Sequence, residues 1–262
     1  ILLLLLGAPG IAWRLSKKET EKKSDLSEAQ NLFLHKSARK TWLFFEQFVN
    51  AESNWLPPDN FQEQPTAVVA HRTSPTNMGL SLLSNLAAQD FGYIGGKEML
   101  ERCNNTISTM LKLERYSGHF YNWYDTLTLQ PLHPKYVSTV DSGNLVGHLL
   151  TLKQGLLSQI HQPIFTNRNY EGIVTTVQII QDIFQGHDAK HTEKILDVLN
   201  TAINEKSSSL SDAKKHLNEL LFLSNQLSLF PANIETELKK WTLRLLHQVK
   251  GFRDDLFQII PW

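Results

Sequence analysis

The sequence predicts an all-α fold, an α/α toroid of helical hairpins with long motif-bearing loops at one end. Apolar residues recur at helical spacing through most of the chain, and no stretch shows the alternation of a half-buried strand. Two predicted connections, 50–73 and from His119 to about Val140, are about twenty residues long, whereas connections between helices are usually far shorter. Each long connection precedes a helix, so both loops and both helix N-termini fall at one end of the array.

The first two helices of this domain have clear start signals. Ser27-Glu-Ala-Gln30 is a capping box, and apolar residues continue on one helical face as far as Val49. Ser74-Pro75 places an N-cap oxygen before a proline at the first helical position. We expect this second helix to end near Gly92.

The later boundaries rest on glycine, proline and capping residues. The turn Gly95-Gly96 begins a third helix, Ser117-Gly118 is expected to end it, and Asp141-Ser142 is expected to cap a fourth. The remainder, from Glu171 to Phe257, predicts three or four amphipathic helices. The residues that punctuate this last part are Pro163, Gly186 and Pro231.

The composition narrows the function classes. The 262 residues include 41% hydrophobic and 20% charged residues, which is typical of a globular chain with one domain or two small ones. Lys+Arg and Asp+Glu number 26 each, so the charge gives no basic footprint for a nucleic acid. Cys103 is the single cysteine, which excludes an internal disulfide and fits a reducing compartment. No His/Cys cluster has the spacing of metal ligands, and we expect neither a metal nor a cofactor.

The N-terminal segment begins with the apolar run Ile1 to Leu6. This run is shorter than the about 20 residues that span a bilayer, and no basic region precedes it as in a signal peptide. With Trp13 at the interface and basic residues on the cytoplasmic side, residues 1–16 are predicted to be the tail of a transmembrane helix. Residues 17–26 form a charged linker. The alternative is a frayed apolar terminus with no membrane role. The basic residues are Arg14, Lys17, Lys18, Lys22 and Lys23.

Aromatic rings are concentrated in the two long connections. In Phe120-Tyr-Asn-Trp-Tyr124 adjacent aromatic side chains cannot all face one core, so some must be exposed or line a cleft. Flat apolar faces beside Asp, Asn, His and Arg are the mixture that sugar rings and their hydroxyl groups require. Trp123 is the first choice as a sugar platform and Trp55 the second. The alternative is that these rings plug the mouth of the barrel. The ring candidates are Trp55, Phe61, Phe120, Tyr121, Trp123 and Tyr124.

Arg72 and two histidines are the basic candidates in the same connections. Arg72 can hold a carboxylate or sugar hydroxyls in a bidentate fork, or it can brace Asp59 or Asp125 as a structural pair. His71 and His119 are sugar ligands in one interpretation and satisfied loop histidines in the other.

The Asp and Glu side chains of these segments are the candidates for catalysing a reaction at a glycosidic bond. Glycoside chemistry uses two carboxyl groups, about 5–5.5 Å apart in retaining enzymes and about 6.5–9.5 Å apart in inverting ones. Asp59, Glu63, Asp125 and Asp141 can supply such a pair, and nothing in the sequence selects one. Asp141 stands where an N-capping aspartate would, and Asp125 is placed to accept hydrogen bonds from hydroxyl groups. Asp125 and Asp141 are therefore only weak catalytic candidates.

Six stretches, taken in order, resemble the central region of the bacterial cyclic β-1,2-glucan synthases. The resemblance is strong from about Ser37 to Leu157 and weak from there to Trp262. The stretches are Ala38-Arg-Lys-Thr-Trp42, Asn54-Trp-Leu-Pro-Pro-Asp-Asn-Phe-Gln-Glu63, Ala70-His-Arg-Thr-Ser-Pro-Thr-Asn77, Asp90-Phe-Gly-Tyr-Ile94, Gly118-His-Phe-Tyr-Asn-Trp-Tyr-Asp-Thr126 and Tyr136-Val-Ser-Thr-Val-Asp-Ser-Gly-Asn-Leu145.

The resemblance implies an activity and its partners. In such synthases a membrane-embedded glycosyltransferase extends a β-1,2-glucan from UDP-glucose. A central glucoamylase-like domain transglycosylates the chain into a ring by a retaining mechanism, and a phosphorylase-like domain trims its length. Residues 27–262 then form the N-terminal part of the central (α/α)6 domain, on the cytoplasmic side of the bacterial inner membrane. The implied partners are β-1,2-glucan, the remaining synthase domains and, through the N-terminal segment, the membrane.

The resemblance also implies a set of glucan-binding residues, but neither a nucleophile nor a general acid. A toroid of six hairpins needs more than the about eight helices predicted here, so the sequence is expected to be a fragment. Two other functions stay open: a non-catalytic glucan-binding module, and a hydrolase that resembles an endo-β-1,2-glucanase. The implied glucan-binding residues are Trp55, Asp59, Asn60, His71, Arg72, Thr73, His119, Asn122, Trp123, Tyr124, Asp125, Asp141 and Asn144.

Overall fold

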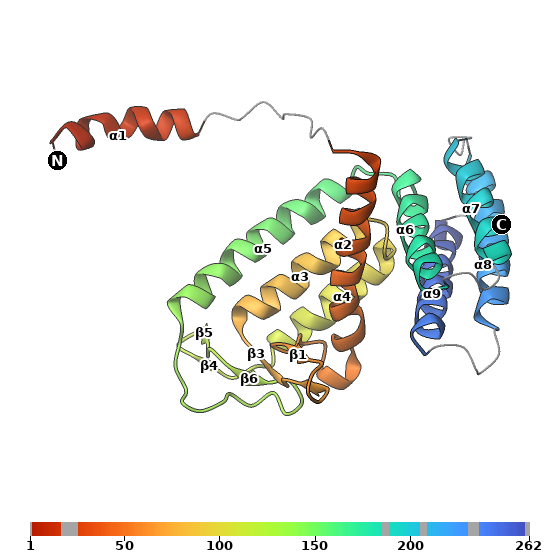
Figure 1. Cartoon of the computed structure of the whole chain (residues 1–262). Coiled ribbons are helices and arrows are strands. Elements are labelled where there is room, and N and C mark those ends of the chain that lie inside the picture. The colour runs from red at the N-terminus through yellow and green to blue at the C-terminus, as the bar shows by residue number, and fades with distance from the viewer. Residues whose placement is uncertain (1, 17–25, 185–188, 205–208, 230–235, 260–262) are drawn as a thin grey trace. The chain divides into compact units, whose positions relative to one another are not determined.

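The computed structural model is mostly helical (Figure 1). It describes residues 2–16, 26–184, 189–204, 209–229 and 236–259. The chain divides into two compact units, Ile1–Leu34 and His35–Trp262.

The first unit contains α1 (Leu2–Leu15) and the first turns of α2 (Glu28–Phe48). Among the described residues, no helix combines the length and the apolar character needed to cross a membrane. The expected linker 17–26 lies outside the described residues except for its last residue. The capping box at the start of α2 is confirmed: the Ser27 amide donates to Gln30 Oε1 at 2.9 Å, and the Gln30 amide donates to Ser27 Oγ at 3.3 Å.

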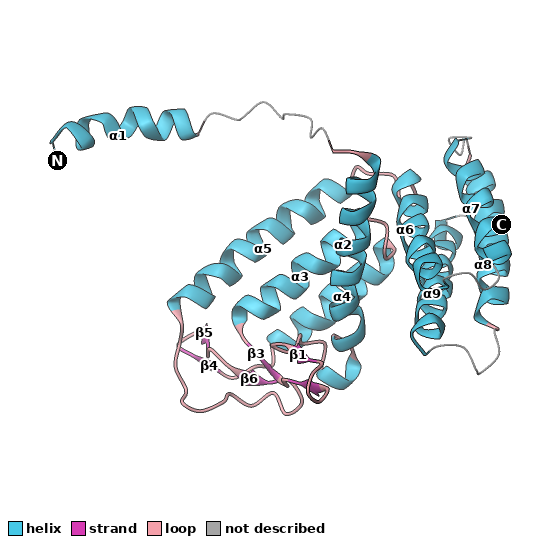
Figure 2. Ribbon diagram, viewed as in Figure 1, coloured by secondary structure: helices cyan, strands magenta, loops and turns pink. Residues whose placement is uncertain are grey.

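The described residues of the second unit form the rest of α2 and seven further α-helices. They also form one 3₁₀ turn and six two-residue strands in the connections, and Figure 2 shows the strands as short magenta segments. The helices are α3 (Pro75–Asp90), α4 (Gly96–Met110), α5 (Thr139–Gln159), α6 (Asn167–Phe184), α7 (Ala189–Asn204), α8 (Leu210–Ser228) and α9 (Thr236–Ile259). The 3₁₀ turn is η1 (Ala51–Ser53), and the strands are β1 (Phe61–Gln62), β2 (Val68–Val69), β3 (Arg72–Thr73), β4 (Arg115–Tyr116), β5 (His119–Phe120) and β6 (Tyr124–Asp125).

Helix α3 packs against both α4 and α5. Helices α3 and α5 run parallel: Asn144 Nδ2 donates to Thr76 Oγ1 at 3.1 Å near their N-termini, and Gln159 Nε2 donates to Gln89 Oε1 at 2.7 Å near their C-termini. Both N-termini therefore lie at the same end, as the sequence predicts. The buried core between α2, α3, α4 and α5 includes Trp42, Leu56, Met78, Leu82, Tyr93, Met99, Cys103, Tyr124, Leu145 and Leu152.

Two helix boundaries differ from the sequence prediction. Helix α4 ends at Met110, and Ser117-Gly118 instead forms the turn of the β4–β5 hairpin, where both residues have positive φ (47° and 85°). Asp141 is not the N-cap of α5. Ser138 is the N-cap, and its side chain accepts from the Asp141 amide at 3.1 Å, so Asp141 lies within the first turn. The starts of α3 at Ser74-Pro75 and of α4 at Gly95-Gly96 agree with prediction.

The short strands were not predicted, because a two-residue strand is too short to show an alternating pattern. They form three two-stranded antiparallel pairs, β1–β2, β4–β5 and β3–β6. The last pair joins the two long connections, which are about fifty residues apart in sequence.

The sequence predicts three or four helices in the C-terminal part, and the described residues contain four, which pack on one another. Helix α6 packs on α7, α7 on α8, α8 on α9, and α9 returns to α6, around a core of their own. This is a four-helix bundle, and its packing does not confirm the predicted toroid. Gly186 and Pro231 lie outside the described residues. The bundle core includes Tyr170, Ile173, Val177, Leu199, Leu217, Leu220, Trp241, Leu245 and Phe252.

A buried ionic cluster joins the bundle to the first four helices of the unit. Arg39 of α2 is 0% exposed, and its Nη1 and Nη2 donate to Glu46 Oε2 and Oε1, both at 3.2 Å. Arg244 of α9 approaches Glu46 Oε2 to 3.2 Å, and Arg39 Nε donates to Thr176 Oγ1 of α6 at 3.3 Å. The guanidinium of Arg39 also lies 5.0 Å from the centre of the Trp241 ring.

Candidate functional site

The two long connections meet, as the sequence predicts. Arg72 of β3 pairs with Asp125 of β6, and Thr73 pairs with Tyr124. Asn54 Nδ2 donates to the carbonyl oxygens of Thr126 at 2.9 Å and Leu127 at 3.0 Å. Backbone pairing and one amide side chain thus fix residues 54–73 of the first connection to residues 124–127 of the second.

Arg72 takes one of its two predicted structural partners and also contacts a candidate sugar platform. Its Nε and Nη2 donate to Asp59 Oδ2 at 3.1 and 2.9 Å, while Asn77 Nδ2 donates to Asp59 Oδ1 at 3.3 Å. The guanidinium lies 4.9 Å from the centre of the Trp123 ring. The Arg72 side chain is still 52% exposed, so it can also meet a ligand.

Asn122 holds the Trp123 ring through a hydrogen bond from the indole nitrogen. In the amide orientation that satisfies all neighbours, Asn122 oxygen accepts from Trp123 Nε1 at 2.7 Å and from the Tyr136 hydroxyl at 2.8 Å. Its nitrogen donates to Asp141 Oδ2 at 2.8 Å. Because Asn122 is buried, this network fixes the plane of the half-buried indole relative to the start of α5.

Trp55 is anchored from the α4 side. Its carbonyl oxygen accepts from Thr106 Oγ1 at 2.9 Å, and the guanidinium of Arg102 lies 5.8 Å from its ring centre. Arg102 also donates from Nη2 to the carbonyls of Phe45 at 2.8 Å and Val49 at 3.1 Å, at the end of α2. The two indoles thus rest on different arginines, and no contact between them is found among the described residues.

Two of the predicted glucan-binding residues lie in the core. Tyr124 is 0% exposed; its hydroxyl donates to Glu114 O and accepts from the Tyr121 amide, both at 2.7 Å, and burial raises its pKa to about 12. Thr73 is also 0% exposed, and its Oγ1 has no hydrogen-bond partner among the described residues. These positions favour a structural role over ligand contact.

The remaining predicted residues lie at the surface of the joined connections. His71 approaches Thr126 Oγ1 to 3.4 Å through its Nδ1, and Asn60 donates to Asp59 Oδ2 at 3.2 Å. His119 pairs with Tyr116 in the β4–β5 hairpin and is exposed, as is Asn144 at the start of α5.

Asp125 is held as an acceptor. Its Oδ1 receives the amides of Leu127 at 2.9 Å and Thr128 at 2.7 Å, and the Thr128 hydroxyl at 3.1 Å. Burial favours the protonated form, but these hydrogen bonds outweigh it and lower the pKa of Asp125. A carboxyl group with a lowered pKa is poorly suited to donate a proton as a general acid.

Asp141 is engaged in the same way, between the N-termini of α3 and α5. Its Oδ2 accepts from Ser138 Oγ at 2.6 Å, and Thr76 and Ser74 of the α3 start also donate to the carboxylate. Burial raises the pKa of Asp141, and the hydrogen bonds from Ser138, Thr76 and Ser74 lower it by more, so the net shift is downward.

Replacing Asp141 with asparagine is expected to lower the free energy of unfolding by about 1–2 kcal/mol at neutral pH, because an amide accepts these hydrogen bonds more weakly. The folded-state pKa lies below the ordinary value of 3.8, so the carboxylate's contribution is complete above that value and disappears as pH falls through the lowered pKa. Urea unfolding of both proteins from about pH 2.5 to pH 7 measures the difference. If the two proteins differ in free energy of unfolding by the same amount at about pH 2.5 and at pH 7, the Asp141 carboxylate does not stabilise the fold through its lowered pKa.

Sequence reasoning missed the residues that hold the site together: Arg102, Asn77 and Ser138. The Ser138-Thr-Val-Asp141 spacing is itself a capping-box signal, so Ser138 was visible in the sequence. Arg102 had no such signal, since its role depends on carbonyls at the end of another helix. Among the described residues, no group of three or more His, Cys, Asp or Glu side chains could hold a metal ion.

Fold and site together define a mostly helical protein with a partly exposed arrangement of indole, guanidinium, amide and carboxylate groups where two long connections pair. Over 250 residues, or 95% of its length, the chain is 36% identical to the cyclic beta-(1,2)-glucan synthase NdvB of Rhizobium meliloti (strain 1021). The resemblance to cyclic β-1,2-glucan synthases that the six stretches indicate is confirmed. The matched region is 9% of the length of that relative.

Two further comparisons add little. A glucoamylase-like protein from Bacteroides fragilis NCTC 9343 aligns with 71% of this chain and 37% of its own, at 16% identity and a TM-score of 0.34. A TM-score of this size does not establish a shared fold. No family model matches the sequence.

Proposed function

We propose that this chain is part of a cyclic β-1,2-glucan synthase and contributes glucan-binding residues to the domain that transglycosylates linear β-1,2-glucan into a ring. The observation that carries the proposal is the pairing of the two long connections, which puts Arg72 against Trp123 at an exposed surface. The identity of 36% to a named synthase supports the substrate class. In this proposal the domain is glycoside-hydrolase-like and retaining, and the chain works beside the synthase's UDP-glucose-using and phosphorylase-like domains.

Trp123 is the proposed sugar platform, with Arg72, His71 and Asn60 as hydroxyl ligands. An indole held by a guanidinium on one side presents a fixed apolar face, so little side-chain conformational entropy of the protein is lost when a sugar stacks on it. The proposal also places the domain at the cytoplasmic side of the inner membrane, with residues 1–16 as the end of a membrane helix. Parallel α3 and α5, with long connections at their N-termini, support hairpins of an (α/α)6 toroid in residues 28–159.

Replacing Trp123 with alanine is expected to weaken binding of linear β-1,2-glucan about tenfold, because the sugar loses a stacking face worth about 1.4 kcal/mol. Titration followed by calorimetry and by tryptophan fluorescence measures the affinity. Trp13→Phe, in the first unit, is the matched control that removes one indole and should leave the affinity unchanged. Equal affinities for the wild type and Trp123→Ala, or no binding by the wild type at millimolar sugar, contradict the proposal.

A second candidate is a non-catalytic module that holds the glucan for another domain. The specific observation in its favour is that Asp125 and Asp141, the two weak catalytic candidates from the sequence, both act as hydrogen-bond acceptors and have a lowered pKa. Product analysis separates the functions. Rings from linear glucan indicate transglycosylation, unchanged polymer indicates a binding module, and linear fragments indicate a hydrolase.

A further inference from the structure

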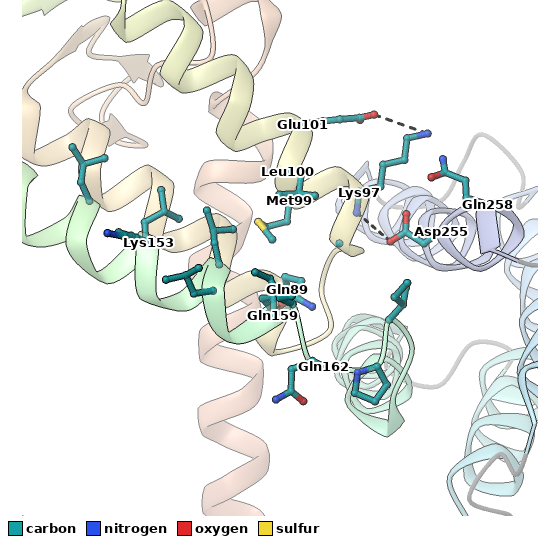
Figure 3. A pocket seen from close by; sticks show the side chains of 18 residues that line it. Gln89, Lys97, Met99, Leu100, Glu101, Lys153, Gln159, Gln162, Asp255 and Gln258 are labelled. Carbon is teal, nitrogen blue, oxygen red and sulfur yellow. Dashed lines mark hydrogen bonds and ion pairs between the residues drawn. The ribbon is translucent and has the colours of Figure 1, made fainter.

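A second feature of the same unit lies away from the paired connections. A cavity of about 890 Å³ lies between the first turns of α4 and the C-terminal half of α5, above Gln89 near the end of α3 (Figure 3). The connections meet at the N-terminal ends of α3 and α5, and this groove lies at their C-terminal ends. It is therefore separate from the proposed glucan site.

The groove is open and mainly aliphatic. Its walls include Met99 and Leu100 of α4 and four leucines of α5, and no aromatic ring lines it among the described residues. Polar side chains, among them Lys97, Glu101 and Asp255, also line it. Leu100, Leu157 and Ile160 are 55%, 47% and 69% exposed. A sugar chain would find no ring to stack on, and a single alkyl chain in an open trough would leave much of its surface in water.

Helix α5 carries more apolar surface than its contacts use. Leu145 and Leu152 face α3 and are buried. A second apolar stripe runs from Val146 to Ile160, a length of about 21 Å at 1.5 Å per residue. A surface helix ordinarily needs one apolar stripe. The exposed residues of the second stripe are Val146, Leu149, Leu150, Leu157 and Ile160.

We propose that this groove seats an amphipathic α-helix from another domain of the synthase, about four turns long and with an acidic residue near its centre. The stripe has the length and the spacing of three and four residues that an opposing helix requires. Lys153 lies in the middle of the stripe, is exposed, and has no ion-pair or hydrogen-bond partner among the residues that the structure describes. An acidic residue on the incoming helix would form an ion pair with Lys153.

The comparison supports another domain as the source of the helix. The synthase that this chain resembles carries the matched region as 9% of its length, so other domains of such a polypeptide are at high effective concentration. This inference rests on the proposed function, since it takes those domains as the partner. A second copy of this chain is the competing occupant, and the test below distinguishes the two.

The test is thiol labelling in the polypeptide that the gene encodes. Leu157→Cys and Ile160→Cys report on the groove, and Thr151→Cys and Gln154→Cys are matched controls on the opposite, polar face of α5. Cys103 gives little background, because it is buried and burial raises its pKa to about 11. We expect the two groove thiols to react with a maleimide roughly tenfold more slowly than the controls, because reaction requires the docked helix to open.

Groove thiols that react as fast as the controls overturn the proposal. In the 262-residue chain alone both groove thiols should react fast at all protein concentrations. Protection that rises with concentration, together with a dimer in sedimentation, overturns it in favour of a second copy. Glucan binding is measured separately on the same variants. Protected groove thiols without glucan binding support the docking surface and refute the proposed function. Glucan binding with unprotected groove thiols supports the proposed function and refutes the docking surface.

Discussion

Replacing Glu46 with alanine will lower the free energy of unfolding by about 3–5 kcal/mol, the range measured when one partner is removed from a buried ion pair. The Glu46 carboxylate accepts hydrogen bonds from Nη1 and Nη2 of the fully buried Arg39, both at 3.2 Å, and lies 3.2 Å from Arg244 Nε. Without this carboxylate two guanidinium groups stay charged in a site with little water. Because the two arginines come from α2 and α9, the loss should loosen the attachment of the bundle.

Chemical unfolding followed by circular dichroism measures the effect, and hydrogen exchange in α9 shows where it acts. Glu101→Ala is the matched control, because the one ion pair of Glu101 among the described residues is the exposed pair with Lys97 at 4.0 Å. This control should change stability by less than about 0.5 kcal/mol. A loss of less than about 1 kcal/mol for Glu46→Ala would show that water reaches the cluster and that the ion pairs are not structural.

The boundaries that the sequence predicts correctly have local causes. The capping box at Ser27 and the Ser-Pro start at Ser74 act over three or four residues, so they can be recognised without knowing the fold. The end of α4 was predicted too late because Ser117-Gly118 has the residues of a helix end and of a hairpin turn alike. The sequence does not separate Asp141 from Ser138 as the N-cap, because both are capping residue types and they lie only three residues apart.

The arrangement of the C-terminal helices could not be predicted in the same way. Apolar periodicity identifies the buried face of each helix, but it does not identify the helix on which that face packs. Helices α6 and α9 contact each other although about fifty residues separate them, and this contact turns a row of hairpins into a closed bundle. The resemblance was strong only as far as about Leu157, so it did not reach this region.

The candidate site was predicted in part. Its location at the long connections follows from their length and composition, and the β3–β6 pairing brings them together. The choice between Asp59 and Asp125 as the structural partner of Arg72 stayed open, because both are near it and only the folded backbone directs the guanidinium to Asp59. Tyr124 and Thr73 could not be separated from their exposed neighbours by residue type, because burial in a loop has no periodic signal.

Replacing Gly172 with alanine is the second change with a large expected effect, a loss of about 3 kcal/mol in the free energy of unfolding. Helix α6 crosses the turn between α3 and α4 at this residue with backbone against backbone. A Cβ on Gly172 would overlap the carbonyl of Gly92 and would lie 2.6 Å from Phe91 O. The turn cannot move away easily, because Gly92 has φ +69°, its own Cα faces Arg168 O closely, and its carbonyl accepts from Gln248 Nε2 at 2.7 Å.

Gly147→Ala is the matched control, since Gly147 also lies inside a helix and a Cβ there meets nothing within 4 Å. This substitution should raise the free energy of unfolding by about 0.5–1 kcal/mol, because alanine loses less backbone entropy in a helix than glycine does. Urea unfolding of the two variants beside the wild type gives both values. If Gly172→Ala is as stable as Gly147→Ala, α6 does not touch the turn after α3, and the close packing of the bundle against the first helices is wrong.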